Sequence, residues 1–231
     1  MLTPDTLANL PPDRPGSAWA VTRIIAAGLN PVAFFEGLTP GADIDALLDI
    51  LRVTSPSLVD LIGDPTLVSD ADRVYGPGAG WVMPAFTRRA RKSRFTAGRY
   101  GVWYAAREVE TAIAETMYHT RLRLLETNEP AQEVAMQVLT ADLAGFAAVL
   151  TGLDGELDSA IHDPNSYDRS QIVGQTLRDR GSEAIVYRSV RRSGGICFGV
   201  LRPRSVRNCI RTGYVNYFWD RTSIRAGPVT P

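Results

Sequence analysis

The chain has 231 residues, of which 45% are hydrophobic and 22% charged, and its 25 basic and 25 acidic side chains give a formal net charge of zero. This composition is typical of a folded globular protein and excludes a chain that is disordered throughout. The zero net charge excludes a nonspecific DNA coat or a polybasic membrane anchor as the main function.

The first half of the chain predicts an arm, a strand and a helical insertion. We expect residues 1–20, which are rich in proline, to form an N-terminal arm, and residues 21–231 to form a single catalytic domain. Residues 21–25 read V-T-R-I-I, in which all but Arg23 are β-branched, and predict a strand. Apolar residues at helical spacing predict a helix over 42–53, and a second short helix is predicted to end at Gly63, so that 42–63 forms a helical insertion.

The second half predicts a mixture of strands and helices. A glycine-rich loop at 76–80 lacks the Lys-Ser/Thr that ends a phosphate-binding P-loop, so we interpret it as a turn. The most regular helical pattern covers 108–127. Because strands and helices do not alternate strictly, the pattern favours an α+β fold over a doubly wound parallel sheet. The other predicted elements are strands at 100–106, 133–139, 184–189, 195–201 and 206–210, and a helix at 166–181.

The charges are segregated along the chain although they sum to zero. Residues 1–72 carry a net charge of −7, residues 73–107 of +8, residues 108–187 of −9 and residues 188–231 of +8. Of the basic side chains 24 are arginines, a bias that a GC-rich genome also explains. If the fold brings the two basic segments together, the protein can bind a small anion in spite of its net charge.

Two further features bear on localisation and on metal binding. The N-terminal residues lack the basic and apolar regions of a signal peptide, and no apolar run reaches the ~20 residues of a membrane span. We therefore expect a cytoplasmic protein without a membrane partner. Cys197 and Cys209 lack metal-ligand spacing, and His119 and His162 lie far apart in sequence, so we expect buried free thiols and no metal site.

Polar residues occur in four segments at positions where packing alone would not require them. Arg94 and Arg99 precede the predicted strand at 100–106, and Tyr104 lies within that strand. The next helix carries Glu115 and, one turn later, His119. The strand at 184–189 ends in Ser189.

These segments together resemble the RES domain family. An arginine precedes a strand that reads V-x-Y-A-A, the following helix reads E-T-A-I-A-E-x-x-x-H, and a later strand ends in serine. The resemblance implies a fold similar to that of ADP-ribosyltransferases, with a mixed β core and flanking helices. It also implies that the protein is the toxin of a toxin–antitoxin pair and that NAD⁺ is its substrate.

The resemblance assigns roles to individual residues. Glu115, Arg94, Ser189 and Tyr104 correspond to the catalytic residues of the family, and Arg94, Tyr104 and Ser189 also to residues that bind NAD⁺. Arg23 is the best candidate for an additional N-terminal arginine. The usual G-G-R-W-N sequence is replaced here by S-R-F-T, so Arg94 and Arg99 are both candidates for the family arginine, and both are expected to bind NAD⁺.

These residue types suit the chemistry of NAD⁺ cleavage. The planar guanidinium group of arginine binds phosphate oxygens through charge-assisted hydrogen bonds. Cleavage of the nicotinamide–ribose bond builds positive charge on the ribose, which a fixed carboxylate such as that of Glu115 stabilises. Ser189 can bind the nicotinamide amide or a ribose hydroxyl. Glu108 and Glu110 resemble the E-x-E motif of other ADP-ribosyltransferases, but two acids in the first turn of a helix are also explained by the helix dipole.

The sequence leads to one main hypothesis and two alternatives. The main hypothesis is a mono-ADP-ribosyltransferase toxin that modifies a target protein. A cognate antitoxin, expected to be of the helix-turn-helix type, is expected to cover its active site. The first alternative is an NAD⁺ glycohydrolase or phosphorylase that depletes cellular NAD⁺. The second is a nonenzymatic nucleic-acid-binding module that uses the two basic segments, whereas the enzyme hypotheses expect no direct contact of the toxin with nucleic acid.

Overall fold

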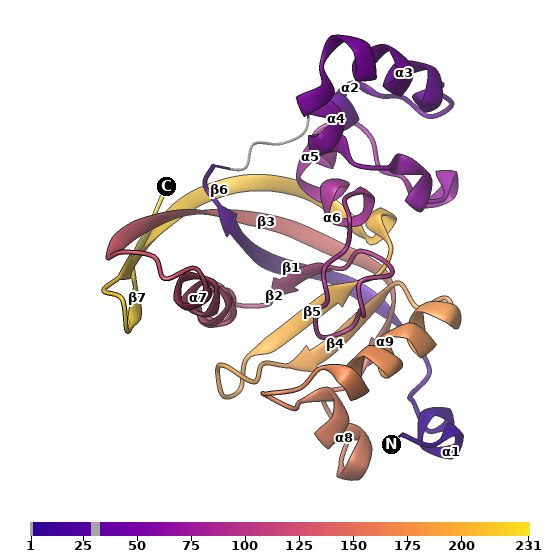
Figure 1. Cartoon of the computed structure of the whole chain (residues 1–231). Coiled ribbons are helices and arrows are strands. Elements are labelled where there is room, and N and C mark those ends of the chain that lie inside the picture. The colour runs from indigo at the N-terminus through magenta and orange to yellow at the C-terminus, as the bar shows by residue number, and fades with distance from the viewer. Residues whose placement is uncertain (1, 29–32) are drawn as a thin grey trace.

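A mixed β-sheet forms the centre of the computed structural model, which describes residues 2–28 and 33–231 (Figure 1). Its strand order is β1-β2-β5-β4-β3-β6-β7, and β1 pairs in addition with β3. The pair β3–β4 is parallel and the other pairs are antiparallel. The strands are β1 (Arg14–Ala26), β2 (Trp103–Ala106), β3 (Gln132–Val149), β4 (Ala184–Arg188), β5 (Ile196–Val200), β6 (Val206–Trp219) and β7 (Ile224–Thr230).

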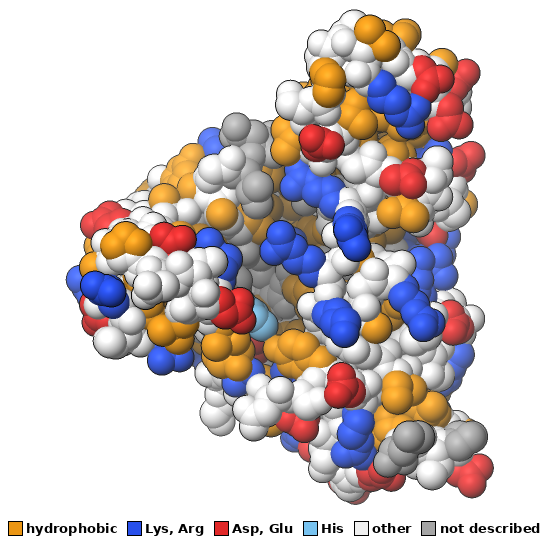
Figure 2. Space-filling view, in the orientation of Figure 1, with side chains coloured by type: hydrophobic (Ala, Val, Ile, Leu, Met, Phe, Trp, Pro, Cys, Tyr) orange, Lys and Arg blue, Asp and Glu red, His pale blue; other side chains and the backbone are white. Residues whose placement is uncertain are grey.

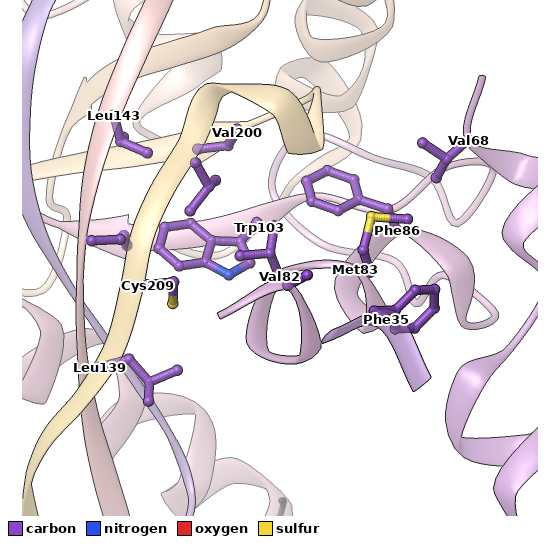
Figure 3. Packing of buried hydrophobic residues seen from close by; sticks show 14 of the residues in the cluster. Phe35, Val68, Val82, Met83, Phe86, Trp103, Leu139, Leu143, Val200 and Cys209 are labelled. Atoms are coloured by element: carbon purple, nitrogen blue, oxygen red, sulfur yellow. The ribbon is translucent and has the colours of Figure 1, made fainter. Parts of the chain in front are cut away.

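The helices that follow β1 cover one face of the sheet. Successive residues of a strand point to opposite faces, and Leu139 and Ala141 of β3 point to this one. Figure 3 shows the indole of Trp103 beside Val82, with Phe86 farther along the same cluster. The helices of this face are α2 (Ala33–Gly37), α3 (Ile44–Thr54), α4 (Pro56–Ile62), η1 (Pro65–Leu67), η2 (Asp70–Asp72), α5 (Ala79–Val82) and α6 (Pro84–Thr87).

The other face of the sheet carries a second apolar cluster and the remaining α-helices. Met136 and Val138, which alternate with the β3 residues of the first cluster, belong to this cluster. The helices on this side are α1 (Pro4–Ala8), α7 (Val109–Glu126), α8 (Gly155–Ile161) and α9 (Asp168–Asp179), while the 3₁₀-helix η3 (Pro203–Ser205) leads into β6. In Figure 1, α7 lies below the long curved strands β3 and β6, and α9 lies beside β4. The described part of the chain contains no helix long and apolar enough to span a membrane.

The observed class is α+β, as the irregular order of elements predicts, but several boundaries differ. β1 begins at Arg14, so residues 14–20 belong to a strand and not to the expected arm. β2 begins only at Trp103, three residues later than predicted. β3 and β6 extend far beyond the predicted strands because each pairs with the other along most of its length. α8 and β7 were not predicted.

The two helices predicted within the insertion are present as α3 and α4. Asp43 accepts a hydrogen bond from the amide of Ala46 and so caps α3, and α4 ends at Gly63, whose φ of 76° favours glycine. A Cβ at Gly63 would lie 2.3 Å from the carbonyl oxygen of Thr87. The insertion therefore packs tightly on the segment that leads from α6 toward Arg94.

Candidate active site

A cavity of about 380 Å³ lies at the sheet between β1, β2 and α7. In Figure 2 the molecule is hollowed between the part that contains α7 and the rest of the chain. Four of the six residues predicted for the site line this cavity. Ser189 is not among the lining residues but forms a hydrogen bond with Glu115, which is. The lining residues are Thr22, Arg23, Ile24, Lys92, Ser93, Arg94, Tyr104, Ala105, Ala106, Ala112, Glu115, Thr116, His119, Tyr167, Tyr187 and Cys197.

Glu115 enters the cavity from α7, and Ser189 holds its carboxylate. The Ser189 hydroxyl donates a hydrogen bond to Oε1 of Glu115 at 2.6 Å. The same hydroxyl accepts hydrogen bonds from the amides of Arg191 and Arg192 at 3.1 and 3.0 Å. Its one proton and both lone pairs are thus in use. The structure therefore brings Ser189 to the site as the partner that orients the carboxylate of Glu115.

Arg23 contributes a buried cation from the middle of β1. Its Nη1 donates to the carbonyl oxygen of Tyr104 at 2.7 Å, and the guanidinium carbon lies 5.1 Å from the ring centroid of Trp103. Burial lowers the pKa of Arg23 to about 10, so the group stays charged at neutral pH. Its Nε is buried and has no hydrogen-bond partner, and within the described ranges Arg23 forms no ion pair with a carboxylate. An anionic ligand would supply the missing counter-charge.

Arg94 contributes a second buried cation, and it is anchored through Nη1. That nitrogen donates to the carbonyl oxygens of Ile161 and Asp163 at 2.7 and 3.0 Å. The guanidinium carbon lies 4.7 Å from the ring centroid of Tyr167 and 6.0 Å from that of Tyr187. Like Arg23, Arg94 has no carboxylate partner in the parts of the chain that the structure describes.

Helix α9 holds the turn that carries Arg94. Ser170 donates to the carbonyl oxygen of Arg94 at 2.7 Å, and Gln171 donates to that of Ser93 at 3.0 Å. Gly174 lies one turn later, where a Cβ would be 2.2 Å from the carbonyl oxygen of Phe95. The absence of a side chain at Gly174 lets the turn approach the helix closely.

Tyr104 lines the cavity with its ring, while its hydroxyl braces the same turn. The hydroxyl lies 2.9 Å from Oγ of Ser93 and accepts a hydrogen bond from the amide of Phe95 at 3.0 Å. Burial raises the pKa of Tyr104 to about 12, although these two hydrogen bonds and Arg94 oppose the shift. Tyr104 is therefore neutral at physiological pH and is suited to positioning Arg94.

Two more titratable groups adjoin Glu115. Burial lowers the pKa of His119, the carboxylate of Glu115 opposes this shift, and Arg191 and Arg94 add to it. His119 is thus mainly neutral at pH 7. The Sγ of Cys197 lies 3.8 Å from Oε1 of Glu115, and burial raises the pKa of this thiol well above its ordinary value, so it remains protonated.

The prediction that Arg99 takes part in this site is wrong in geometric terms. Arg99 lines a separate cavity together with Arg178 and Arg202, beyond the turn that carries Arg94. Of the two candidates for the family arginine, Arg94 is the one that lines this cavity.

Tyr167 and Tyr187 are cavity residues that were not singled out in the sequence. Tyr167 precedes α9, and Tyr187 lies two residues before Ser189 in β4. Alternation along β4 makes Tyr187 and Ser189 point to the same face, which is a signal that could have identified Tyr187. For Tyr167, which reaches the cavity from a loop, the sequence contains no such signal.

The arrangement combines two unpaired cations, one held carboxylate and several aromatic rings in a single cavity. Oε2 of Glu115 makes no hydrogen bond to any residue that the structure describes. Among residues 2–28 and 33–231, no three His, Cys, Asp or Glu side chains group closely enough to hold a metal ion. Chemically, such a site can bind a phosphorylated ligand and stabilise positive charge that develops near the carboxylate.

The chain is similar in sequence to known proteins over most of its length. A family model described as "RES domain" matches residues 70–220. The protein y4oC of Sinorhizobium fredii is 24% identical over 204 residues, which cover 87% of this chain and 84% of that protein. A chain in the crystal structure of the M. tuberculosis MbcT–MbcA toxin–antitoxin complex aligns over 87% of both chains with 12% identity and a TM-score of 0.43, a similarity too low to carry an argument.

Proposed function

Because this chain belongs to the RES domain family, we propose that it is the toxin of a toxin–antitoxin pair and that it consumes NAD⁺ by cleaving the nicotinamide–ribose bond. The observation that carries this proposal is that Arg23 of β1, Arg94 of the segment before β2 and Glu115 of α7 line one cavity. A cognate antitoxin that covers the cavity, of the expected helix-turn-helix type, is part of the proposal.

The two arginines suit the pyrophosphate of NAD⁺. Both residues line the cavity and have no carboxylate partner among the described residues, and each guanidinium has nitrogens that make no hydrogen bond to these residues. Buried cations are normally paired, because an unpaired charge is costly in a medium of low polarity. A bound pyrophosphate would supply negative charge that the described residues do not provide.

Glu115 suits the developing charge on the ribose. Departure of nicotinamide leaves an oxocarbenium-like ribose, and the leaving group is a neutral base that needs no general acid. Ser189 fixes Oε1 of Glu115, while Oε2 remains available to the cavity. A carboxylate held in place before the reaction stabilises the transition state without having to reorganise.

The aromatic rings suit the nicotinamide. Tyr167 is half-buried at the cavity wall and already stacks on Arg94. A planar ring bound next to it would gain offset stacking and would exclude water from the bond that breaks. Tyr187, on the neighbouring strand β4, closes the same wall.

The acceptor of the ADP-ribose is a separate question. The expectation of a protein acceptor rested on the helical insertion 42–63, but no residue of that segment lines the cavity. The insertion packs with the apolar cluster on the other face of the sheet. Transfer to water or phosphate requires only the cavity, so we propose depletion of NAD⁺, with protein ADP-ribosylation as the alternative to be tested.

Product analysis tests this proposal. Purified protein is incubated with NAD⁺ labelled in the adenylate part, with and without phosphate and a cell extract. We expect free nicotinamide together with labelled ADP-ribose or its phosphate ester. Label retained on a protein band would instead establish ADP-ribosyl transfer. Intact NAD⁺ under all conditions would contradict both versions, and toxicity that persists in Glu115→Ala would favour a nonenzymatic nucleic-acid-binding module.

A further inference from the structure

A second cavity, of about 290 Å³, lies on the far side of the turn that carries Arg94. Its walls come from the region of η1 and η2, the segment 86–101, α9 and the connection from β5 to η3. Nothing in the proposed NAD⁺ chemistry uses it. Its charged lining consists of Arg88, Arg89, Arg99, Arg178, Arg202 and Asp72.

The arginines of this second cavity far outnumber its acidic groups. Asp72 is the one carboxylate among its lining residues. It pairs with Arg202 at 3.0 Å and also with Arg204 at 3.3 Å, so it is fully committed. The charged lining therefore carries a net charge of about +4 if all its groups are ionised. In Figure 2, Lys and Arg side chains gather across the middle of the molecule, below the upper helices.

Some arginines of the second cavity are held by hydrogen bonds to the protein, and others are not. Arg178 donates to the carbonyl oxygen of Leu201 at 3.0 Å, and Arg88 donates to that of Leu61 at 2.8 Å. Carbonyl oxygens orient these groups but do not neutralise them. Arg89 and Arg99 are exposed and form no hydrogen bond or ion pair with the residues that the structure describes. Two oriented cations and two uncommitted ones thus face one concave site.

The electrostatics of Arg178 agree with an excess of positive charge. Burial lowers the pKa of Arg178, and the neighbouring guanidinium of Arg202 lowers it further. Its guanidinium carbon also lies 4.5 Å from the ring centroid of Tyr100, which rigidifies the group. An anion in the cavity would relieve the repulsion between Arg178 and Arg202.

We propose that this second cavity binds a small organic phosphate of about the size of a mononucleotide. The guanidinium forks match phosphate oxygens, and Val68, Phe86 and Pro203 provide apolar walls for the organic part. The volume lies near the lower end of the range for small-ligand sites, ~300–1,000 Å³. A single-stranded nucleic acid would need exposed aromatic rings for stacking, but the ring of Tyr100 is already covered by Arg178.

The two cavities adjoin the same turn, so the test must measure binding and not activity. The hydroxyl of Tyr100 donates to the carbonyl oxygen of Phe95 at 2.5 Å, and the amide of Phe95 donates to Tyr104 at 3.0 Å. A change on one side of the turn can alter NAD⁺ turnover without revealing where a ligand binds. Direct binding also keeps this inference independent of the proposed NAD⁺ cleavage.

The experiment is calorimetric titration of the full chain with AMP, and separately with inorganic phosphate. The double variant Arg89→Gln/Arg99→Gln removes the two exposed cations of the second cavity. The matched control Arg91→Gln removes an exposed cation of the same loop that does not line this cavity. Arg23→Gln removes a cation of the first cavity, so that AMP bound there is recognised.

We expect AMP to bind wild type, Arg91→Gln and Arg23→Gln at the second cavity. We expect it to bind the double variant at least about tenfold more weakly, since the loss of one charge-assisted hydrogen bond weakens binding by about that factor. Binding that survives in the double variant, or that disappears only in Arg23→Gln, would overturn the proposal. So would absence of AMP binding, or binding of a single-stranded oligonucleotide but not of AMP.

Discussion

The hydroxyl of Ser189 donates a hydrogen bond to Oε1 of Glu115 at 2.6 Å, although the two residues lie 74 positions apart in sequence. Glu115 projects from α7, and Ser189 follows directly after β4. The two residues are therefore one functional unit, in which the serine fixes the carboxylate and the carboxylate faces the cavity. The proposed mechanism depends on this unit.

Replacing Ser189 tests its positioning role. Ser189→Ala removes the donor to Glu115 and leaves the amides of Arg191 and Arg192 without their acceptor. We expect kcat for NAD⁺ to fall by about tenfold or more with a smaller change in KM, and the free energy of unfolding to fall by ~1–3 kcal/mol. Ser189→Thr, which keeps a hydroxyl, is expected to restore most of the activity. Full activity in Ser189→Ala would show that the carboxylate does not need this partner.

Replacement of Arg23 and of Arg94 by methionine is expected to change the thermal stability of the protein to different extents. Arg23→Met removes a buried, unpaired cation, which offsets the loss of its hydrogen bond to the carbonyl oxygen of Tyr104, so we expect little change in thermal stability together with at least about tenfold weaker NAD⁺ binding. Arg94→Met leaves the carbonyl oxygens of Ile161 and Asp163 without their donor, so we expect weaker binding and also a lower melting temperature. Thermal melts and NAD⁺ titrations of both variants measure the difference. Equal stability losses would contradict this distinction.

The fold and the site could be predicted from the sequence to different extents. Helices α3, α4 and α7 follow from the local spacing of apolar residues, and the α+β class follows from the order of elements. The full lengths of β3 and β6 could not be predicted, because their pairing joins residues that are 63 to 87 positions apart. α8, which is short, and β7, which contains Gly227 and Pro228 although it forms a local hairpin with β6, were missed.

Three of the four predicted residues that line the cavity lie within regular elements. Tyr104, Glu115 and Arg23 lie in β2, α7 and β1, where the period of the element determines the face. Arg94 and Arg99 both lie in the irregular segment before β2, where no period exists. Only the tertiary contacts of α9 decide which of the two faces the cavity.

His162 should make the stability of the protein depend on pH. Its Nε2 accepts a hydrogen bond from the amide of Arg188, and its Nδ1 lies 2.9 Å from the carboxylate of Asp158, which also pairs with the Arg188 side chain. Burial lowers the pKa of His162, the carboxylate of Asp158 opposes this shift, and Arg188 adds to it.

Because the folded state binds the proton of His162 less readily than the unfolded state, the free energy of unfolding should fall as pH decreases below about 6.5. We expect His162→Gln, which can still accept from Arg188, to show a shallower dependence of melting temperature on pH between about 7 and 5. The pKa of His119 is also lowered, so His119→Gln is expected to make the slope shallower as well, and His162→Gln/His119→Gln to make it shallower than either single variant. An identical slope in wild type and His162→Gln would contradict this assignment.

Gly174 should be intolerant of any side chain. In Gly174→Ala the new Cβ would lie 2.2 Å from the carbonyl oxygen of Phe95, so α9 and the turn that carries Arg94 would have to separate. We expect a loss of stability of ~1–3 kcal/mol from overpacking and a reduced affinity for NAD⁺. Gly152→Ala is the matched control because nothing lies within 4 Å of its Cβ position. Equal melting temperatures for the two variants would show that the close approach is not required.

The most direct test of the account is the rate of nicotinamide release from NAD⁺ by wild type and by Glu115→Gln. The amide of glutamine can still accept the hydrogen bond from Ser189 but carries no charge to stabilise the ribose. Glu126→Gln, at the exposed end of the same helix, is the control for charge removal. We expect Glu115→Gln to remain folded and to release nicotinamide about 10²–10³-fold more slowly than wild type, with no loss in Glu126→Gln. A folded Glu115→Gln that releases nicotinamide at the wild-type rate would contradict the account.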